Sequence, residues 1–329
     1  MRVAMSGLFG FGTQLREAMA PAGLEVVRGY HPDLGRAALW DERRLAMTWQ
    51  EAVEDPRVEA CVIASPTPAH AEQIAIALYA DKPVFVEKPL VSTSAQLAEI
   101  ERLWAPRRRV PFMVGHKARR ATPARAIKAL LDAGILGVVL HMSLHWAHDG
   151  GRRFPHGAWR ADQRRHREGP LQTLGVHLID LVHYWGGPLT TARARLQNRT
   201  GCMTAPDTAT VLLTLASGAQ AVILTSYVQG AAGERIEVHG TRGSAIWTGG
   251  MDGTLTTVDD CGPVPHAARP IDPVVEELRE FRQAVETGWV IETDFGVGAA
   301  AVLVLEACAR SSAAGGRPVE VPTTEGVYA

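Results

Sequence analysis

Apolar residues follow two alternating patterns along residues 1–117. Short β-branched runs, which predict buried strands, alternate with segments in which apolar residues recur at helical spacing. The predicted strands are Arg2–Met5, Glu25–Arg28, Glu59–Ala64, Pro83–Val86 and Val110–Val114, and the predicted helices are Thr13–Ala20, Asp33–Arg43, Ala69–Ala80 and Ser94–Trp104. Alternation of this kind is typical of right-handed βαβ units, so it predicts a parallel sheet with helices on both faces.

The pattern changes after Gly115. The later elements are predicted as a helix at Pro123–Ala133, a strand at Val138–His145, a helix at Leu171–Trp185, five strand-like runs between Thr190 and Thr248, and closing helices at Pro273–Glu286 and Gly296–Ala313. Strands in succession after a βαβ region predict an α+β domain with a large, mostly antiparallel sheet. We therefore expect an α/β protein of two domains, residues 1–117 and residues 118–329.

Composition narrows the classes of function. A formal net charge of −1 over 329 residues gives no field that would attract a polyanion, so we expect no nucleic-acid partner. The four cysteines lie far apart, which argues against a disulfide framework or a zinc module and suits a reducing cytosol. The longest late apolar stretch, "VGAAAVLVLEACA", is too short to span a bilayer, and the N-terminal apolar run is too short for a signal peptide. We expect a cytoplasmic protein without a membrane partner.

A glycine-rich loop, "MSGLFGFGTQ", follows the first predicted strand and precedes a helix. This is the context of a dinucleotide-binding turn, in which glycines permit the tight turn, the approach of the pyrophosphate and close packing of helix on strand. The candidate cofactor contacts are Gly7, Phe9, Gly10, Phe11 and Gly12. Phe9 stands where the second glycine is usual, and Gly10 one residue later restores the room. The alternative is a glycine-rich turn that binds no ligand.

The end of the second predicted strand bears on the choice of nucleotide. An acidic residue about 20 positions after the glycines usually holds the ribose hydroxyls of NAD. Here the sequence "VVRGYHPDLGRA" places Arg28, His31 and Arg36 near that position, with Asp33 as the only acidic residue. Basic side chains suit a 2′-phosphate, so the sequence slightly favours NADP over NAD, although Arg28 would also serve as a surface residue.

The segment "VFVEKPL", residues 84–90, places Glu87 and Lys88 at the end of an apolar strand, where a charge needs a use or a partner. With this E-K-P sequence the chain resembles the Gfo/Idh/MocA family of NAD(P)-dependent oxidoreductases of sugars and polyols. Other matching stretches are "ASPTPAHAEQIAIALYADKP", "MVGHKARRATPARAIKALLDAGILG", "WRADQ", "GPLQTLGVHLID", "DTATVLLTLASGAQ" and "VHGTRGS". The resemblance thus extends over nearly the whole chain.

The resemblance implies an N-terminal Rossmann domain and a C-terminal domain whose open sheet makes a homodimer or homotetramer. It implies that Lys88 lies between nicotinamide and substrate, where its ammonium donates a hydrogen bond to the reacting oxygen, and that the Lys88–Pro89 bond is cis. Further cofactor contacts implied by the family's motifs are Ser65, Thr67, His70, Glu87, Lys88, His116, Trp159 and Arg160. The alternative for Lys88 is a structural pair with Glu87.

The helix predicted at Leu171–Trp185 carries the candidate acid and base. Thr173, His177, Asp180 and Tyr184 recur at helical spacing on one face, while Leu174, Leu178, Leu181 and Trp185 form an apolar stripe. A histidine exchanges protons near neutral pH, so His177 is the candidate acid/base. Many family members carry aspartate four residues before this histidine, where this chain has Thr173. We therefore expect either that Asp180 stabilises the imidazolium or that His177 is a weaker base.

Residues 116–168, which precede this helix, are rich in arginine and histidine. Arg119 and Arg120 are both candidates for substrate binding, because the spacing in "GHKARRATP" departs by one residue from the family's pattern.

The later arginines are expected in a solvated loop, and the alternative is a lid that closes over an anionic group. They are Arg152, Arg153, Arg164, Arg165 and Arg167. No carboxylate or cysteine joins His141 and His145 at ligand spacing, so no metal is expected.

Three functions fit these features. The first is a dehydrogenase or reductase that moves a hydride between nicotinamide and a secondary alcohol or carbonyl of a small, sugar-like molecule. The second is a redox-neutral enzyme with a tightly retained nicotinamide, which would oxidise its substrate transiently for elimination or epimerisation. The third is a dinucleotide-binding sensor without catalysis, against which the presence of both Lys88 and His177 argues.

Overall fold

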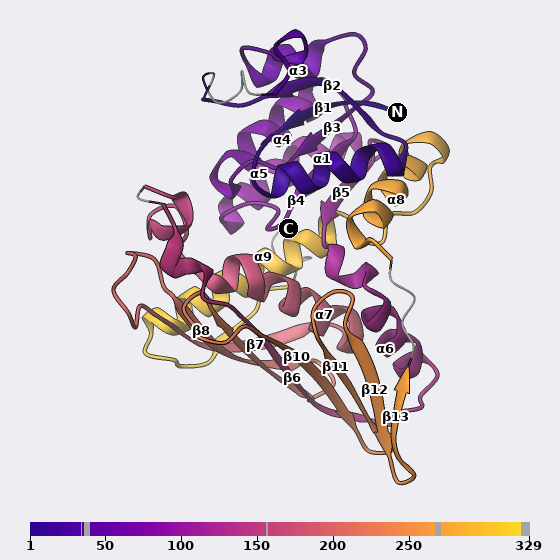
Figure 1. Ribbon diagram of the computed structural model, residues 1–329, viewed down its shortest axis with the longest axis vertical. Coiled ribbons are helices and arrows are strands. Elements are labelled where there is room, and N and C mark those ends of the chain that lie inside the picture. The colour runs from indigo at the N-terminus through magenta and orange to yellow at the C-terminus, as the bar shows by residue number, and fades with distance from the viewer. Residues whose placement is uncertain (34, 36–39, 156, 267–270, 324–329) are drawn as a thin grey trace. The chain divides into compact units, whose positions relative to one another are not determined.

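The first compact unit is built on a parallel sheet. A computed structural model describes residues 1–323 except residues 34, 36–39, 156 and 267–270. The five strands have the order β2-β1-β3-β4-β5, and each pair is parallel (Figure 1). They are β1 (Arg2–Ser6), β2 (Glu25–Tyr30), β3 (Ala60–Ile63), β4 (Val84–Glu87) and β5 (Phe112–Gly115). The α-helices between them are α1 (Phe11–Ala22), α3 (Trp49–Glu54), α4 (His70–Tyr79) and α5 (Ser94–Trp104). The predicted Rossmann-like sheet is therefore confirmed.

The second strand is followed by a region where sequence and structure differ. Of the helix predicted at Asp33–Arg43, residues 34 and 36–39 lie outside the described residues, and its last residues belong to a 3-10 turn. The described elements after it are the 3-10 turn η1 (Glu42–Arg44) and α3, which was not predicted. Helix α3 begins with Thr48 as N-cap, whose hydroxyl accepts a hydrogen bond from the amide of Glu51 at 3.0 Å. Its six residues are too few for a helical period to stand out in the sequence.

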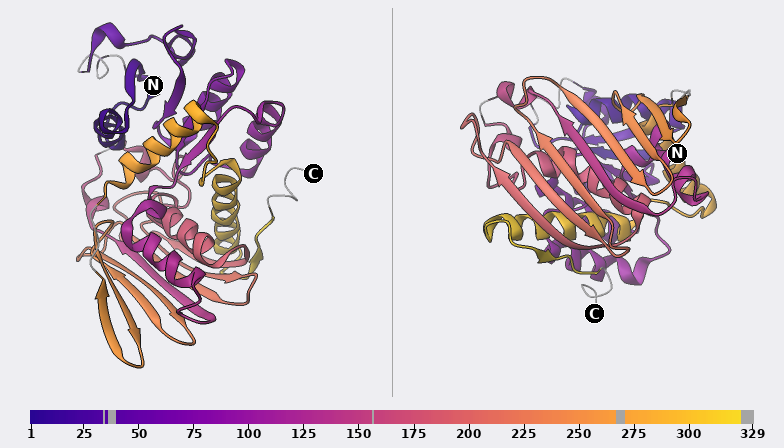
Figure 2. Two further views of the ribbon diagram at one scale, coloured as in Figure 1. Left: turned by 90° about the vertical axis from the view of Figure 1, so that its right-hand side faces the viewer. Right: turned by 90° about the horizontal axis from the view of Figure 1, so that it is seen from below.

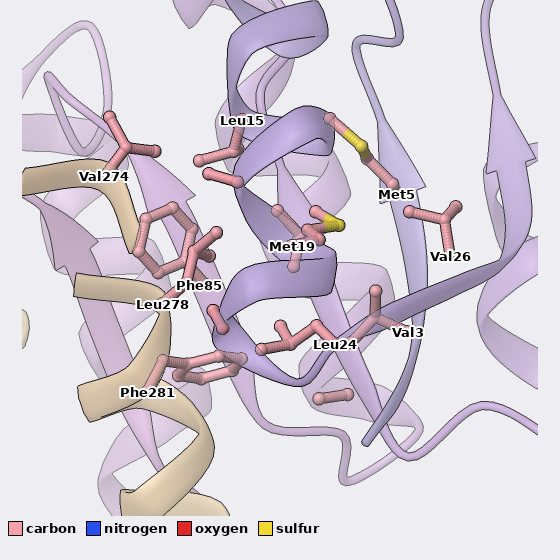
Figure 3. Packing of buried hydrophobic residues seen from close by; sticks show 14 of the residues in the cluster. Val3, Met5, Leu15, Met19, Leu24, Val26, Phe85, Val274, Leu278 and Phe281 are labelled. Carbon is pink, nitrogen blue, oxygen red and sulfur yellow. The ribbon is translucent and has the colours of Figure 1, made fainter. Parts of the chain in front are cut away.

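Residues from the C-terminal half complete the core of the first unit. The chain divides into Met1–His116 with Val274–Val302, and Lys117–Pro273 with Leu303–Thr323, instead of two contiguous domains. Helix α8 (Pro273–Thr287) packs its apolar side chains against α1 and β4 (Figure 3). The rings of Phe281 and Phe85 meet edge to face with centroids 5.8 Å apart. Burial of this apolar stripe explains why α8 belongs with residues far from it in sequence.

The second unit is built on a nine-stranded sheet of order β13-β12-β11-β10-β6-β9-β8-β7-β14. Its strands are β6 (Val139–Ala147), β7 (Leu189–Gln197), β8 (Thr208–Leu215), β9 (Gln220–Ser226), β10 (Gly233–Gly240), β11 (Ser244–Thr248), β12 (Thr254–Asp259), β13 (Gly262–His266) and β14 (Val319–Glu320). Every pair is antiparallel except β6 with β9. The mostly antiparallel sheet is confirmed, and β12, β13 and β14 extend it beyond the predicted runs.

One face of this sheet carries helices. Helices α6 (Thr122–Asp132) and α7 (Val176–Gly186) lie against this face. Seen from the opposite face, the strands of the sheet lie side by side with no helix in front of them (Figure 2, right). Side chains alternate accordingly along β6, where Met142 and Leu144 are buried. Helix α7 starts later than predicted, because residues Leu171–Gly175 form a π-helical turn, η7, before it. That turn gives Thr173 a different environment from His177.

The last helix, α9 (Phe295–Ala313), contains the apolar stretch that we expected to be too short for a membrane. The helix has 19 residues, and among the described helices it alone has the length and composition to cross a bilayer. Of its most apolar window 61% is buried within the protein, and core helices of soluble proteins have the same properties. Length and hydropathy therefore do not distinguish this helix from a core helix.

We predict that Gly12→Ala lowers the free energy of unfolding by about 1–3 kcal/mol, the usual cost of overpacking. A Cβ on Gly12 would lie 1.7 Å from the carbonyl oxygen of Gly7, and a backbone oxygen cannot swing away as a side chain does. Urea denaturation of the cofactor-free protein measures the change. Gly230→Ala is the matched control, because its Cβ would meet nothing within 4 Å. Equal stability of the two variants would contradict the close approach in the loop.

Candidate active site

The glycine loop has the geometry of a dinucleotide-binding turn. It joins β1 to α1, and Gly7 has φ of +79°, with a hypothetical Cβ 2.3 Å from the backbone of Ala64. Gly10, with φ of +66°, is open on the outside, since a Cβ there would meet nothing within 4 Å. The loop is thus closed toward the sheet and open at the N-terminus of α1, where backbone N–H groups suit an anion. These residues fit the pyrophosphate of a dinucleotide.

The residues expected at the ribose are held by neighbours in the same unit. Arg28 forms ion pairs with Glu51 and with Asp55, the latter at 3.5 Å. Phe9 packs edge to face on the ring of His31, with centroids 5.2 Å apart. The charge of Arg28 is therefore already balanced by two carboxylates, which sequence reasoning did not anticipate.

The ends of β1 and β3 are joined through a glutamine that the sequence analysis missed. The hydroxyls of Ser6 and Ser65 both donate hydrogen bonds to Oε1 of Gln73, each at 2.7 Å. Thr67, two residues after Ser65, begins the 3-10 turn η2 (Thr67–Ala69) and is buried. Gln73 therefore fixes Ser65, a candidate cofactor contact, relative to the glycine loop.

His70 joins the turn after β3 to the segment that follows Lys88. Its Nδ1 lies 3.0 Å from the carbonyl oxygen of Pro89, and its Nε2 lies 2.9 Å from that of Ser65. Burial lowers the pKa of His70 against the raising effect of these carbonyl groups. His70, expected as a cofactor contact, thus positions the backbone on either side of the candidate site.

Lys88 itself is partly exposed at the carboxyl end of β4. The Lys88–Pro89 peptide bond is cis, as the resemblance implied. The preceding Glu87 is buried, and its Oε2 accepts a hydrogen bond from the amide of Lys88 at 3.3 Å. The absence of a side chain at Gly115 leaves room for Glu87, because a Cβ there would lie 2.8 Å from its Oε1. His116, the next residue, is fully buried.

In the second unit, Thr173 belongs to a buried hydrogen-bonded chain. Its hydroxyl contacts the hydroxyl of Tyr227, which in turn lies 3.0 Å from Nε2 of His166. Burial raises the pKa of the Tyr227 phenol, so this group stays protonated at neutral pH. A neutral hydroxyl chain therefore occupies the place where many relatives were expected to have a carboxylate. Tyr227 and His166 were missed, because Tyr227 lies 54 residues from Thr173.

Asp180 and Arg119 form a buried bidentate ion pair. Nε and an Nη of Arg119 lie 2.8 Å from the two carboxylate oxygens of Asp180, and both side chains are at most 6% exposed. The Arg119 guanidinium also lies over the ring of Tyr184, 4.8 Å from its centroid. The sequence analysis assigned Arg119 to substrate and Asp180 to His177. The structure brings these two predicted site residues together and leaves the charge of Asp180 balanced by Arg119.

His177 is buried against an aromatic side chain. Its ring stacks on that of Trp146 in β6, with centroids 5.5 Å apart and 25° between the planes. Thr173, His177 and Asp180 were predicted on one helix face, and each contacts a different side chain: Tyr227, Trp146 and Arg119. The π-helical turn at Leu171–Gly175 accounts for part of this difference.

The arginine-rich segment is mostly solvated, as expected. Its exposed members are Arg152, Arg153, Arg164, Arg165 and Arg167. Trp159 and Arg160 stack on each other, with the guanidinium carbon 4.9 Å from the ring centroid. Arg120 is almost fully buried. Across the described part of the chain, no group of three or more histidine, cysteine, aspartate or glutamate side chains could hold a metal ion.

Comparison with protein families identifies the class. The model described as "Oxidoreductase family, NAD-binding Rossmann fold" matches residues 1–116, and that described as "GFO/IDH/MocA C-terminal domain" matches residues 124–246. The chain belongs to the Gfo/Idh/MocA family of oxidoreductases.

Individual relatives agree with this assignment. An uncharacterized oxidoreductase of Synechocystis sp. is 32% identical over 240 residues, 68% of this chain but only 64% of that protein. Inositol 2-dehydrogenase 2 of Mycolicibacterium vanbaalenii is 30% identical over 257 residues, 75% of this chain and 72% of that protein. The chain thus spans slightly less than two thirds of the first relative's length.

Solved structures show the same fold. A putative NADPH-dependent oxidoreductase of Desulfitobacterium hafniense superposes with a TM-score of 0.91 at 22% identity, covering 99% of this chain and 98% of its own. Levoglucosan dehydrogenase in complex with NADH gives a TM-score of 0.88 at 21% identity, covering 98% and 99%. At this identity the likeness establishes the fold alone.

We predict that Glu168→Gln becomes progressively more stable than the wild type as the pH rises. Burial raises the pKa of Glu168 to about 7. Because the folded state holds this proton more tightly than the unfolded state, the native carboxyl loses stability between pH 4.5 and pH 7, whereas an uncharged amide does not. The difference in free energy of unfolding should grow by about 2–3 kcal/mol from pH 5 to pH 8. Urea denaturation at several pH values measures it, with exposed Glu99→Gln as control. A pH-independent difference would mean that Glu168 titrates normally.

Proposed function

We propose that the protein is an NAD(P)-dependent dehydrogenase or reductase that acts on a secondary alcohol or carbonyl of a sugar, polyol or related small molecule. The observation that carries the proposal is Lys88 at the carboxyl end of β4, in the same Rossmann unit as an open glycine loop. Ligands of parallel sheets bind at the carboxyl ends of the strands. Relatives named as inositol 2-dehydrogenases and D-apiose dehydrogenase support a polyol or sugar substrate.

Each candidate residue has a distinct part in this proposal. The glycine loop and Ser65 hold the dinucleotide, whose nicotinamide, when bound, supplies the acceptor or donor of the hydride. The ammonium of Lys88 donates a hydrogen bond to the reacting oxygen and stabilises negative charge that develops there. His177 takes the hydroxyl proton at a ring nitrogen during oxidation and returns it during reduction.

The cofactor choice depends on Arg28. The sequence slightly favoured NADP because of basic residues near the ribose. The ion pairs of Arg28 with Glu51 and Asp55 offset the charge that a 2′-phosphate would use. We propose that NAD serves at least as well as NADP, which agrees with the NAD-binding description of the matching family.

We also propose that the helix-free face of the nine-stranded sheet joins copies of this chain into a homodimer or homotetramer. Val222 and Leu224 on β9 are 38% and 42% exposed, and Arg235 and Glu237 lie two strands away on β10, beyond His145 and Ser143 of β6. Exposed apolar side chains rimmed by charged ones are typical of interfaces. Light scattering of the purified protein should give a mass of at least two chains, and Val222→Glu should reduce it. A monomeric wild type would contradict this.

For the function itself, we predict that Lys88→Met lowers the turnover rate by at least about 10²-fold. This is the usual effect of losing a hydrogen-bond donor to a developing oxyanion. Absorbance of reduced nicotinamide, followed with a panel of polyols and sugars and with both NAD and NADP, measures turnover. Dinucleotide binding, measured by calorimetry, should remain. Lys128→Met is the control, because Lys128 forms an exposed ion pair on α6 with Asp132. Wild-type turnover in Lys88→Met would show that Lys88 has no such part.

A further inference from the structure

We propose that Trp146 is a positioning residue that strengthens His177 as a base, because the stacked indole stabilises the protonated imidazole in place of a carboxylate at position 173. The inference rests on the proposed function only for its effect on turnover. Its effect on the proton affinity of His177 follows from the geometry of the second unit alone.

The contact between the two rings has the geometry of a cation–π interaction. Trp146 lies on the helix-covered face of β6, and its ring faces that of His177 with 5.5 Å between centroids and 25° between planes. A cation within about 6 Å of the face of an indole is attracted by the ring quadrupole, and the attraction grows when water is excluded. His177 is only 4% exposed. The stacked arrangement therefore favours the charged form of His177.

Glu234 is the cross-strand neighbour of Trp146. Its position on β10 lies directly opposite Trp146 in the antiparallel pair, so both side chains project from the same face. Burial raises the pKa of the Glu234 carboxyl beside this ring. Leu181 and Trp247 line the same small pocket.

Several charged side chains lie on α7 and on the segment packed against it. On α7 itself the carboxylate of Asp180 is balanced by Arg119, whose guanidinium approaches both oxygens at 2.8 Å. His183, on the same helix, lies near that pair. The segment packed against α7 also carries Lys117, Arg119 and Arg120. Thr173 offers a hydroxyl bound to Tyr227 instead of a charge. The ring of Trp146 contacts His177 directly.

The test is the pKa of His177 in the cofactor-free protein, followed by NMR with His177→Gln to assign the signal. We expect Trp146→Phe to lower it by about 0.5 and Trp146→Leu by about 1. Trp247→Leu is the matched control, because its indole donates to the carbonyl oxygen of Gly250 and should leave the pKa of His177 unchanged. If Trp146 only shields His177 from water, truncation would hydrate the ring and raise its pKa. An unchanged or raised value in folded variants would overturn the proposal.

Turnover provides an independent readout. In Trp146→Phe, the acidic limb of the pH profile of kcat/KM for oxidation should move to lower pH, and the limiting rate should fall about 2–10-fold because a weaker base accepts the proton less readily. A uniform loss of rate at unchanged limb position would overturn the role of Trp146 as base-strengthening group. The two proposals fail separately: full activity of Lys88→Met would contradict the proposed function without altering the NMR titration of His177.

Discussion

Two full charges lie buried in the second unit, and the arrangement of its candidate active site depends on their pairing. Arg119 and Asp180 make a bidentate contact, which satisfies both carboxylate oxygens and two of the guanidinium N–H groups. Removing one partner of such a pair typically costs about 3–5 kcal/mol, because the other charge stays buried without compensation. The pair joins η4 (Lys117–Arg120) to α7, and thereby fixes the rotation of α7 about its own axis. Once that rotation is set, His177 faces Trp146 on the sheet.

The Arg119–Asp180 pair also bears on the proposed acid/base chemistry of His177. Families with a carboxylate beside the histidine can stabilise the imidazolium by direct charge, at the expense of placing an anion in the site. Here Thr173, Tyr227 and His166 form a hydrogen-bonded chain, and Asp180 pairs with Arg119. We propose that the face of Trp146 stabilises the protonated imidazole of His177 in this unit.

The extent to which the sequence predicted this structure follows from the range of the interactions involved. Elements with a strong local period, such as β4 or α5, were located within a residue or two. Glu87, Lys88 and the glycine loop could be proposed as site residues from the sequence because their motifs are contiguous. Gln73, Tyr227 and Trp146 were missed, since each acquires its role from a residue that only sheet order or helix packing brings near. The Arg119–Asp180 pair spans 61 residues and could not be chosen over equally plausible partners from spacing alone.

The return of α8 to the first unit has a consequence for how the protein is made. Val274, Leu278 and Phe281 cover apolar side chains of α1 and β4, so the N-terminal core stays incomplete until residue 281 has left the ribosome. At ordinary rates of synthesis this interval is on the order of ten seconds or more. During that time the nascent Rossmann sheet exposes the apolar side chains that α8 later covers. Cotranslational folding of this chain is thus completed from its C-terminal end.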